Sequence, residues 1–298
     1  MRKAIALLIT LMFVMIISVA VGYGLSQMKK ASKVTQDEDM LYRSTLIVGD
    51  VLTILKNSTD LNQLLDENSS ADLYTFFQTT SYLPLNIGSE KVVLSLKSAR
   101  SKININSLNK KNELLFRNYF NRYMIGSNYV DVLKDCMRKN QAKDEYNNYT
   151  SRLFDEYPSL FRDYIASKKH LMKINKFYLQ EYGDMNLKML PFDDLFCYRA
   201  AQNEAVDLNY ATVDVWQLML DTSKERAEIL VQGEGAYNSI EDLQLTPEEK
   251  INLKKFKTTF YAPYIFVEIE IMRQKSISKI HFIYDIKLKK GYDFVFEV

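Results

Sequence analysis

The chain has 298 residues, of which 39 are basic and 37 are acidic, so its formal net charge is only +2 at pH 7. This length allows one large domain or two smaller ones, and the small net charge excludes a global field that would attract nucleic acid. The low content of glycine (nine) and proline (five) argues against low-complexity linkers, while 20 Tyr and 16 Phe supply apolar area for a core.

The first feature in chain order is an apolar run over residues 5–25. No charged side chain occurs between Ala4 and Met28. About 20 helical residues, at about 1.5 Å rise each, cross the roughly 30 Å hydrocarbon layer of a bilayer. A buried core helix would keep a polar stripe, and a secretory signal peptide would have a shorter apolar core. The run continues past the small residues at Ser18–Ala20, and therefore predicts a retained transmembrane helix.

A very short leader, residues 1–4, precedes this run. It holds two basic residues and ends at Ala4, an arrangement that resembles a prepilin leader. The resemblance implies cleavage by a leader peptidase between Ala4 and Ile5, with the apolar run kept in the mature protein. Major subunits of that family carry Glu at the fifth mature position, which is Ile9 here. An unpaired carboxylate in hydrocarbon is costly. In lacking this Glu, the chain resembles minor subunits that sit at a filament tip.

The helical pattern continues beyond the apolar run. Apolar residues recur at three- and four-residue steps from Leu41 to Leu55, and the polar residues 57–60 interrupt the pattern. We therefore expect one spine helix over residues 5–57, half in the membrane and half on a globular head. Its membrane half would pack on partner helices by close van der Waals contact through Ile5, Leu8, Ile9, Leu11, Met12 and Ile16.

The period of the pattern changes near residue 90. Residues 91–97 are predicted to form a strand, and residues 101–106 alternate polar and apolar side chains as a half-buried strand does. The short segment between them suits a turn, so we expect a hairpin. Residues 264–271, 279–288 and 292–298 are expected to form an antiparallel meander at the C-terminal end.

The long stretch between these two sets of strands is expected to be helical. The predicted fold class is therefore α+β: a long N-terminal helix (the membrane spine) packed on an antiparallel pilin-like sheet, with a large all-α domain inserted between strands. The insertion would separate the second strand of the sheet from the third. The expected domains are the leader 1–4, the spine 5–57, a pilin-like head made of 58–106 and 257–298, and the inserted helical domain 107–256.

The most specific motif lies in the insert, at residues 206–243, and resembles a helix-hairpin-helix unit. Helices are expected at 213–220 and 224–232. Asn209 would cap the turn before the first helix by accepting backbone N–H bonds, and Ala211 would allow close helix packing. We expect this unit to be structural rather than catalytic. The residues that carry the motif are Asp207, Asn209, Ala211, Ala227, Asp242 and Leu243.

The hairpin of this unit bears on nucleic-acid binding. DNA-binding versions have a Gly-apolar-Gly hairpin, whose backbone N–H groups approach phosphate closely. Here the hairpin is Leu220–Ser223, which lacks glycine and places the acidic Asp221 where phosphate would lie. Nucleic-acid binding is therefore disfavoured, and we expect the unit to contact protein.

Several features follow one another in a specific order along the chain. A leader ending at Ala4 precedes a spine without the family's Glu; then come strands ending in Asn104 and Asn106, a helical insert and the motif at 206–243. This order is similar to that of the K-type minor pseudopilin of type II secretion systems, and the resemblance covers nearly the whole chain. It implies a subunit at the pseudopilus tip that initiates assembly, because the insert makes the head too bulky to repeat along a filament.

The same resemblance implies partners and a location. The partners would be the I-type and J-type minor pseudopilins, the major pseudopilin and the inner-membrane secretion platform. The chain would cross the bacterial inner membrane once, hold its C-terminal head in the periplasm and support protein export across the outer membrane. Two alternatives remain: a DNA-binding pilin-like protein of a DNA-uptake or type IV pilus system that uses the helix-hairpin-helix unit, and a membrane-tethered enzyme.

Calcium is the one cofactor that the resemblance raises, because some K-type proteins bind it in the insert. Calcium takes six to eight oxygen ligands, mostly carboxylates and carbonyls. Lysines lie among the candidate ligands, which favours a solvated charged face over a calcium site. We therefore predict that the chain has no cofactor. The candidate ligands are Asp135, Asn140, Asp144 and Glu145.

Residues typical of catalysis are few, so we do not expect an enzyme. His170 and His281 are the only histidines, and neither has a metal-ligand spacing. No nucleophile elbow or phosphate-binding glycine loop occurs. We expect His281 in a strand and His170 on an exposed helix. Cys136 and Cys197 either pair in an oxidising periplasm or remain free thiols.

Overall fold

The computed structural model describes residues 23, 27–28, 38, 40–67, 69–87, 90–137, 151–200, 204–273 and 276–297. The predicted leader and the membrane positions from Ala4 to Ile16 lie outside these described residues. Across the ranges that are described, no helix combines the length and the apolar character that a bilayer crossing requires.

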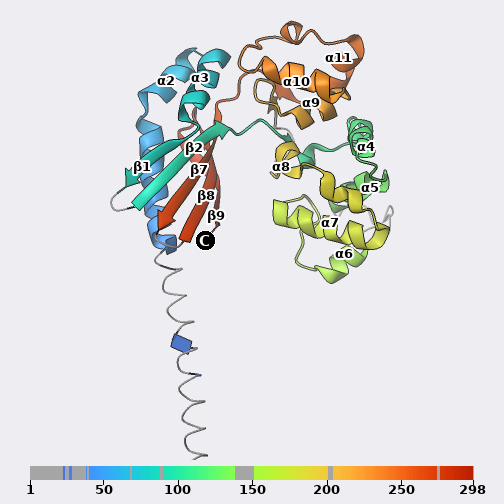
Figure 1. Cartoon of the computed structure of the whole chain (residues 1–298), viewed down its shortest axis with the longest axis horizontal. Helices are drawn as coiled ribbons and strands as arrows, with labels where there is room; N and C mark the ends of the chain where they lie inside the picture. Colours follow the sequence, from blue (N-terminus) through green and yellow to red (C-terminus); the bar gives the residue numbers. More distant parts are fainter. Residues whose placement is uncertain are drawn as a thin grey trace, which may run out of the picture.

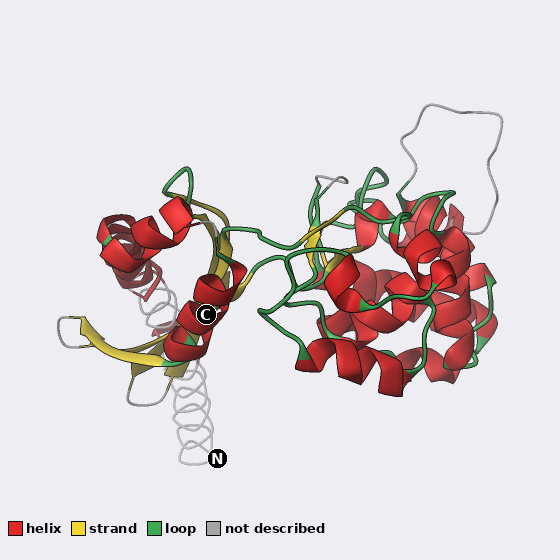
Figure 2. Cartoon of the chain, turned by 90° about the horizontal axis from the view of Figure 1, so that it is seen from above, coloured by secondary structure: helices red, strands yellow, loops and turns green. Residues whose placement is uncertain are grey.

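The described chain forms two lobes (Figure 1). The sheet lobe combines a five-stranded sheet with a helix over residues 40–57 and with two shorter helices, α2 (Thr59–Glu67) and α3 (Ser70–Thr80). The helical lobe consists mainly of short helices. Only a few extended segments join the two lobes (Figure 2).

The sheet is antiparallel throughout. Its strands are β1 (Leu83–Ile87), β2 (Glu90–Ser98), β7 (Tyr264–Arg273), β8 (Ser276–Asp285) and β9 (Lys290–Glu297). They lie in the order β1-β2-β7-β8-β9, so the predicted C-terminal meander is confirmed. The helical lobe is inserted between β2 and β7, the second and third strands of this sheet. The sequence predicted an insertion after residues 101–106, but β2, which ends at Ser98, precedes it.

The hairpin predicted from residues 91–97 and 101–106 is wrong. β2 pairs instead with β1, an edge strand where a proline is tolerated. β3 (Ile103–Asn104) leaves the sheet and runs parallel to β4 (Phe196–Cys197) in the helical lobe. Polar and apolar residues alternate here because both asparagines of the segment are buried in hydrogen bonds, and not because one face of a strand meets water.

The helix over residues 40–57 packs on one face of the sheet. It buries Ile47, Val48, Val51 and Leu55 against the side chains that alternate along the strands. The helix ends at residue 57, where the sequence pattern breaks. The hydroxyl of Ser58 then accepts the N–H of Leu61 at 3.3 Å, at the start of α2. The strand residues in this core are Val92, Leu94, Leu96, Ile265, Val267, Ile269, Ile271, Ile280, Phe282 and Tyr284.

The helical lobe encloses a separate apolar core, rich in aromatic side chains such as Phe116, Phe120, Tyr129 and Trp216. The two helices predicted for the motif are found with the predicted bounds, as α9 (Val213–Leu220) and α10 (Lys224–Gln232). The other helices are α4 (Glu113–Arg122), α5 (Asn128–Cys136), α6 (Ser151–Glu156), α7 (Lys168–Tyr182), α8 (Phe192–Leu195) and α11 (Pro247–Leu253). The remaining short elements are η1 (Ile105–Ser107), η2 (Met185–Met189), η3 (Glu241–Leu243), β5 (Val206–Asp207) and β6 (Thr258–Thr259).

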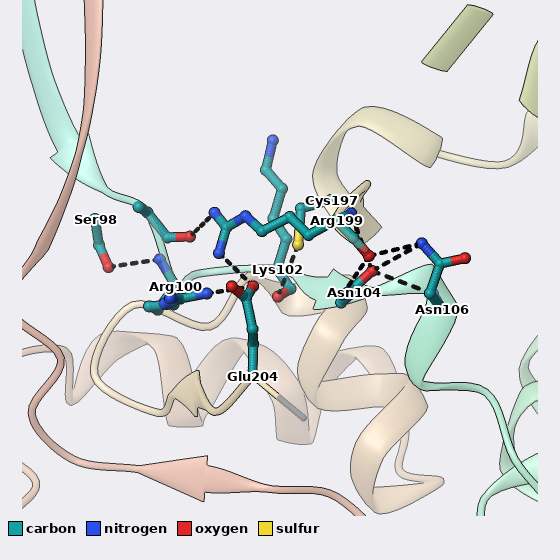
Figure 3. A network of polar contacts seen from close by, with 9 residues as sticks. Ser98, Arg100, Lys102, Asn104, Asn106, Cys197, Arg199 and Glu204 are labelled. Carbon is teal, nitrogen blue, oxygen red and sulfur yellow. Dashed lines mark hydrogen bonds and ion pairs between the residues drawn. The ribbon is translucent and has the colours of Figure 1, made fainter. Parts of the chain in front are cut away.

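A largely buried ion-pair network lies where the chain passes from the sheet to the helical lobe (Figure 3). The carboxylate of Glu204 pairs with both Arg100 and Arg199. Arg199 also donates to the carbonyl of Ala99 at 2.7 Å. Because Ala99 and Arg100 directly follow β2, the network fixes the point at which the chain leaves the sheet.

Candidate protein-interaction site

An apolar face of the helix over residues 40–57 stays uncovered in the described part of the chain. Tyr42 and Leu46 are 66% and 53% exposed, and they lie on the side of the helix opposite the residues that pack on the sheet. Gly49 and Thr53 continue the same side at helical spacing. We call these four residues the helix stripe. Its exposed apolar surface makes it a candidate for a protein contact.

Gly49 gives the helix stripe a notch. A Cβ atom built at this position would have no other atom within 4 Å, so no contact in the described chain requires a glycine here. Glycine costs about 1 kcal/mol in a helix interior, whereas small residues on a helix face let a second helix approach closely. The hydroxyl of Thr53 donates to the carbonyl of Gly49 at 2.9 Å and needs no outside partner. The stripe therefore suits a packed helix.

Asn104 and Asn106 anchor the first segment of the helical lobe (Figure 3). Oδ1 of Asn104 accepts the backbone N–H of Asn106 at 3.2 Å and that of Arg199 at 3.3 Å. The carboxamide of Asn106 bonds both backbone groups of Ile165: Oδ1 accepts the N–H at 2.7 Å, and Nδ2 donates to the C=O at 3.0 Å. These bonds tie β3 to segments that are distant in sequence.

Asp207 and Asn209 repeat this arrangement further along the chain. Oδ1 of Asp207 accepts the N–H of Asn209 at 3.1 Å. Asn209 bonds both backbone groups of Tyr237, accepting the N–H at 3.0 Å and donating to the C=O at 2.8 Å. Each pair also begins at a two-residue parallel bridge, β3 with β4 and β5 with β6. The helical lobe thus contains two copies of one polar anchor. Most of their partners are backbone groups, although Nδ2 of Asn106 also donates to Oδ1 of Asn104 at 3.3 Å.

The two anchors differ in charge. Asp207, which is fully buried, has the position in the second anchor that the neutral Asn104 has in the first. Burial raises the pKa of Asp207 to about 7, although N–H groups of Asn209 and Ala262 oppose the rise. Its Oδ2 atom has no hydrogen-bond partner among the described residues. The carboxyl group is therefore more readily protonated than that of an exposed aspartate.

The hairpin Leu220–Ser223 contacts other helices of the same lobe. Asp221 has a left-handed backbone, with φ of 56°, and its carboxylate accepts from Asn118 and Arg122, both at 2.6 Å. Nδ2 of Asn252 donates to the carbonyl of Leu220 at 3.0 Å. A phosphate at this hairpin would meet an acidic side chain and α4, which strengthens the sequence argument against nucleic-acid binding.

The other motif residues have packing or capping positions. Ala211 and Ala227 are fully buried and Leu243 is nearly so. Asp242 is exposed, and its Oδ2 accepts the backbone N–H groups of Asn238 and Ser239, each at 2.8 Å. These two bonds lower the pKa of Asp242.

The predicted metal ligands are mostly outside the described residues. Asp135 is described, whereas Asn140, Asp144 and Glu145 are not. In the described ranges, no group of three or more His, Cys, Asp or Glu side chains could hold a metal ion. Calcium binding by the insert therefore stays a prediction.

The cysteines and histidines have structural surroundings. Cys136 and Cys197 are free thiols, and burial raises the pKa of each. The prediction that His170 lies on an exposed helix face is wrong: it is buried, and its Nδ1 accepts the N–H of Ala166 at 3.2 Å. This burial, together with the charge of Lys173, lowers the pKa of His170. His281 lies in β8, as expected.

The helix stripe was not predicted from the sequence. The predicted contact surface of the spine lies within residues 5–16, and the apolar residues near position 50 were predicted only to extend the helix. The missed signal was the presence of Tyr42 and Leu46 on the side of the helix opposite the positions that face the sheet. A helix with apolar residues on two sides needs two partners, and the sheet provides only one.

No protein-family model and no curated protein matches the chain. Among solved structures, it is similar to a chain of the GspK-GspI-GspJ complex from the type 2 secretion system of enterotoxigenic Escherichia coli. The TM-score is 0.51 at 11% sequence identity, and the match covers 83% of this chain and 92% of that chain. The two chains share an α+β fold. At the level of the fold, the likeness confirms the resemblance inferred from the sequence.

Proposed function

We propose that the chain is a minor pseudopilin of a type II secretion system that lies at the pseudopilus tip, initiates pseudopilus assembly and supports protein export across the outer membrane. The observation that carries the proposal is the helix stripe, which offers an uncovered apolar helix face on a chain with a pseudopilin-like fold. The solved complex with this fold joins three components, GspK, GspI and GspJ. The helix stripe supplies the surface on which I-type and J-type helices would pack.

The position of the helical lobe supports a place at the tip. It extends sideways from the sheet lobe, away from the helix over residues 40–57 (Figure 1). A subunit repeated along a filament needs neighbours on all sides of its head, and a lateral lobe of this size would overlap them. A subunit at the end of the filament meets no such limit.

The remaining contacts and the location follow from the same proposal. Residues 5–25 anchor the chain in the inner membrane, with the head in the periplasm. The major pseudopilin lies below the tip, and the inner-membrane secretion platform holds the chain before assembly. A structural role rather than an enzymatic one is supported by the two polar anchors, whose side chains bind backbone groups.

Co-purification tests the proposal. The chain is co-expressed with the I-type and J-type candidates from its own gene neighbourhood, solubilised in detergent and captured by a tag. We expect both partners to be retained by the wild type and lost from Tyr42→Lys/Leu46→Lys. The matched control is Met185→Lys, an exposed apolar position on η2 of the helical lobe. Equal retention by the stripe variant, or no retention by the wild type, would contradict the proposal.

A DNA-binding assay separates the alternative function. A DNA-uptake pilin would bind duplex DNA with an affinity that falls steeply as salt rises. The contacts of Asp221 with α4 predict no such binding. Salt-dependent binding that is abolished by changes in the hairpin 220–223 would favour the alternative.

A further inference from the structure

A groove of about 410 Å³ lies where the outer face of the sheet meets the helical lobe. Three parts of the chain line it: the end of β2 with the segment that follows it (Lys97–Ala99, Ser101 and Lys102), residues 196–199 of the helical lobe, and side chains of β7, β8 and β9. We call it the interlobe groove. The helix stripe lies on the other side of the sheet, because Phe266 of the groove alternates along β7 with Ile265 and Val267, which face the helix. The two surfaces are therefore independent.

The floor of the interlobe groove is apolar. Phe196 belongs to the helical lobe, and Phe266 and Val295 belong to the sheet. The ring of Phe266 lies against the ring of His281, with centroids 5.4 Å apart, which fixes its position. Val295 pairs with His281 in the register of β8 and β9, and its side chain remains 42% exposed. The floor can therefore accept an apolar side chain from outside.

Basic side chains line the end of the interlobe groove that is nearest the helical lobe. Lys97 is exposed and Lys102 is half-buried, and neither forms an ion pair within the described ranges. Figure 3 shows the side chain of Lys102 extending away from the ion-pair network. Arg199 also lines the groove, but Glu204 already neutralises its charge. The two lysines are thus the cations available to a ligand.

Acidic side chains line the sheet side. Glu268 lies 4.0 Å from Lys279, and Asp293 is exposed on β9. A polyanion such as single-stranded nucleic acid carries a phosphate at every nucleotide and would place several of them against these carboxylates. A ligand with only one or two negative charges avoids this repulsion.

We propose that the interlobe groove binds an extended acidic segment of a partner protein, in which a carboxylate side chain neighbours an aromatic one. The carboxylate pairs with Lys97 and Lys102, and the aromatic side chain packs on Phe266 and Val295. Charge-assisted hydrogen bonds at one end and apolar burial at the other fix the direction of the segment. This interaction goes beyond the proposed function and does not require the helix stripe.

Isothermal titration calorimetry with the detergent-solubilised full chain tests the inference. The probe is the peptide acetyl-Gly-Glu-Phe-Glu-Phe-Gly-amide, and its matched counterpart has lysine in place of both glutamates. We expect the acidic peptide to bind and the basic one not to bind. Lys97→Glu/Lys102→Glu should raise the dissociation constant at least about tenfold. Phe266→Ala should weaken binding by a similar factor, through loss of the apolar floor.

Lys250→Glu/Lys254→Glu is the matched control, because both lysines are exposed on or beside α11 and the change in net charge is the same. If the charge reversal prevents folding, Lys97→Gln/Lys102→Gln replaces it, with the same expectation. The inference is overturned by equal binding of the two peptides, by unchanged affinity in the groove variants, or by absence of heat at millimolar peptide. Tighter binding of a single-stranded oligonucleotide than of the acidic peptide overturns it as well. Co-purification through the helix stripe is unaffected by these variants, so the two proposals fail separately.

Discussion

Tyr210 of the helical lobe stacks on Tyr74 of α3 in the sheet lobe, with ring centroids 6.3 Å apart. The ring of Phe77 meets the ring of Tyr210 edge-on, with centroids 5.3 Å apart. Nearby, the hydroxyl of Ser70 donates to the carbonyl of Phe260 at 2.7 Å. A side chain of the insert therefore completes the apolar core of the other lobe, and the stability of the two lobes is coupled.

Truncation of Tyr210 tests this coupling. Tyr210→Ala should lower the free energy of unfolding by about 2–3 kcal/mol, because it leaves a cavity between Tyr74 and Phe77. Urea unfolding followed by intrinsic fluorescence measures the loss. Tyr210→Phe is the control: the hydroxyl has no hydrogen-bond partner among the described residues, so its removal should be neutral or slightly stabilising. A large loss in the Phe variant would show that the hydroxyl, and not the ring, joins the lobes.

Asp207 should make stability depend on pH. Its pKa in the folded state is raised from 3.8 to about 7, so the folded chain binds this proton more tightly than the unfolded chain does. The stability from this group is complete below about pH 4 and is lost as the pH rises through about 7. The rise in pKa corresponds to at most roughly 4 kcal/mol. Asp207→Asn should flatten this part of the curve, as measured by urea unfolding at each pH.

Asp242→Asn is the matched control for that experiment. The pKa of Asp242 is lowered by two backbone N–H groups, so its contribution is present above its ordinary pKa and lost on acidification. Its replacement should change the acid side of the curve alone. An unchanged slope between pH 4 and 7 in Asp207→Asn would show that the buried carboxyl does not govern this dependence.

Asn209 should be among the most sensitive polar residues. Its carboxamide makes three hydrogen bonds, two to Tyr237 and one to the carbonyl of Phe260. Asn209→Ala leaves buried backbone groups unpaired and should cost about 2–4 kcal/mol in the free energy of unfolding. Asn106→Ala should cost a similar amount, since the first anchor has the same geometry. Asn238→Ala, at an exposed position, serves as the control, and a comparable loss there would contradict a special role for the anchors.

Gly49→Ala should separate stability from assembly. The helix gains up to about 1 kcal/mol because alanine has the higher helix propensity and the added Cβ meets no atom. The same methyl group fills the notch of the helix stripe, so retention of the partner pseudopilins in the co-purification assay should fall. Thermal unfolding by circular dichroism measures the first effect. Gain in stability without loss of partners would show that no helix packs closely at Gly49.

Much of the fold follows from local patterns in the sequence. The meander at the C-terminal end and the helices α9 and α10 were predictable because their periodicity is regular and their ends carry strong signals. Thr212 and Ser223, for example, cap the two helices by accepting N–H groups from Val215 and Arg226. These signals act over three residues and need no tertiary information.

The hairpin that β1 and β2 form was not predictable in the same way. Its true first strand contains Pro84, which weakens the strand pattern, and the alternation at 103–106 has another cause. The pairing of Asn106 with Ile165 spans 59 residues and leaves no periodic trace. The interlobe groove likewise draws its lining from three distant segments, so only the folded chain reveals it.

The insertion leaves and re-enters the sheet lobe at facing positions, since Ser98 at the end of β2 pairs with Ile265 at the start of β7. A two-residue connection could therefore close the gap if the whole helical lobe were excised. The sheet would keep its register, and the rings of Tyr210 and Tyr261 would be missing from its core. The lobe is thus one continuous insertion, which a short turn could replace at the cost of these aromatic contacts.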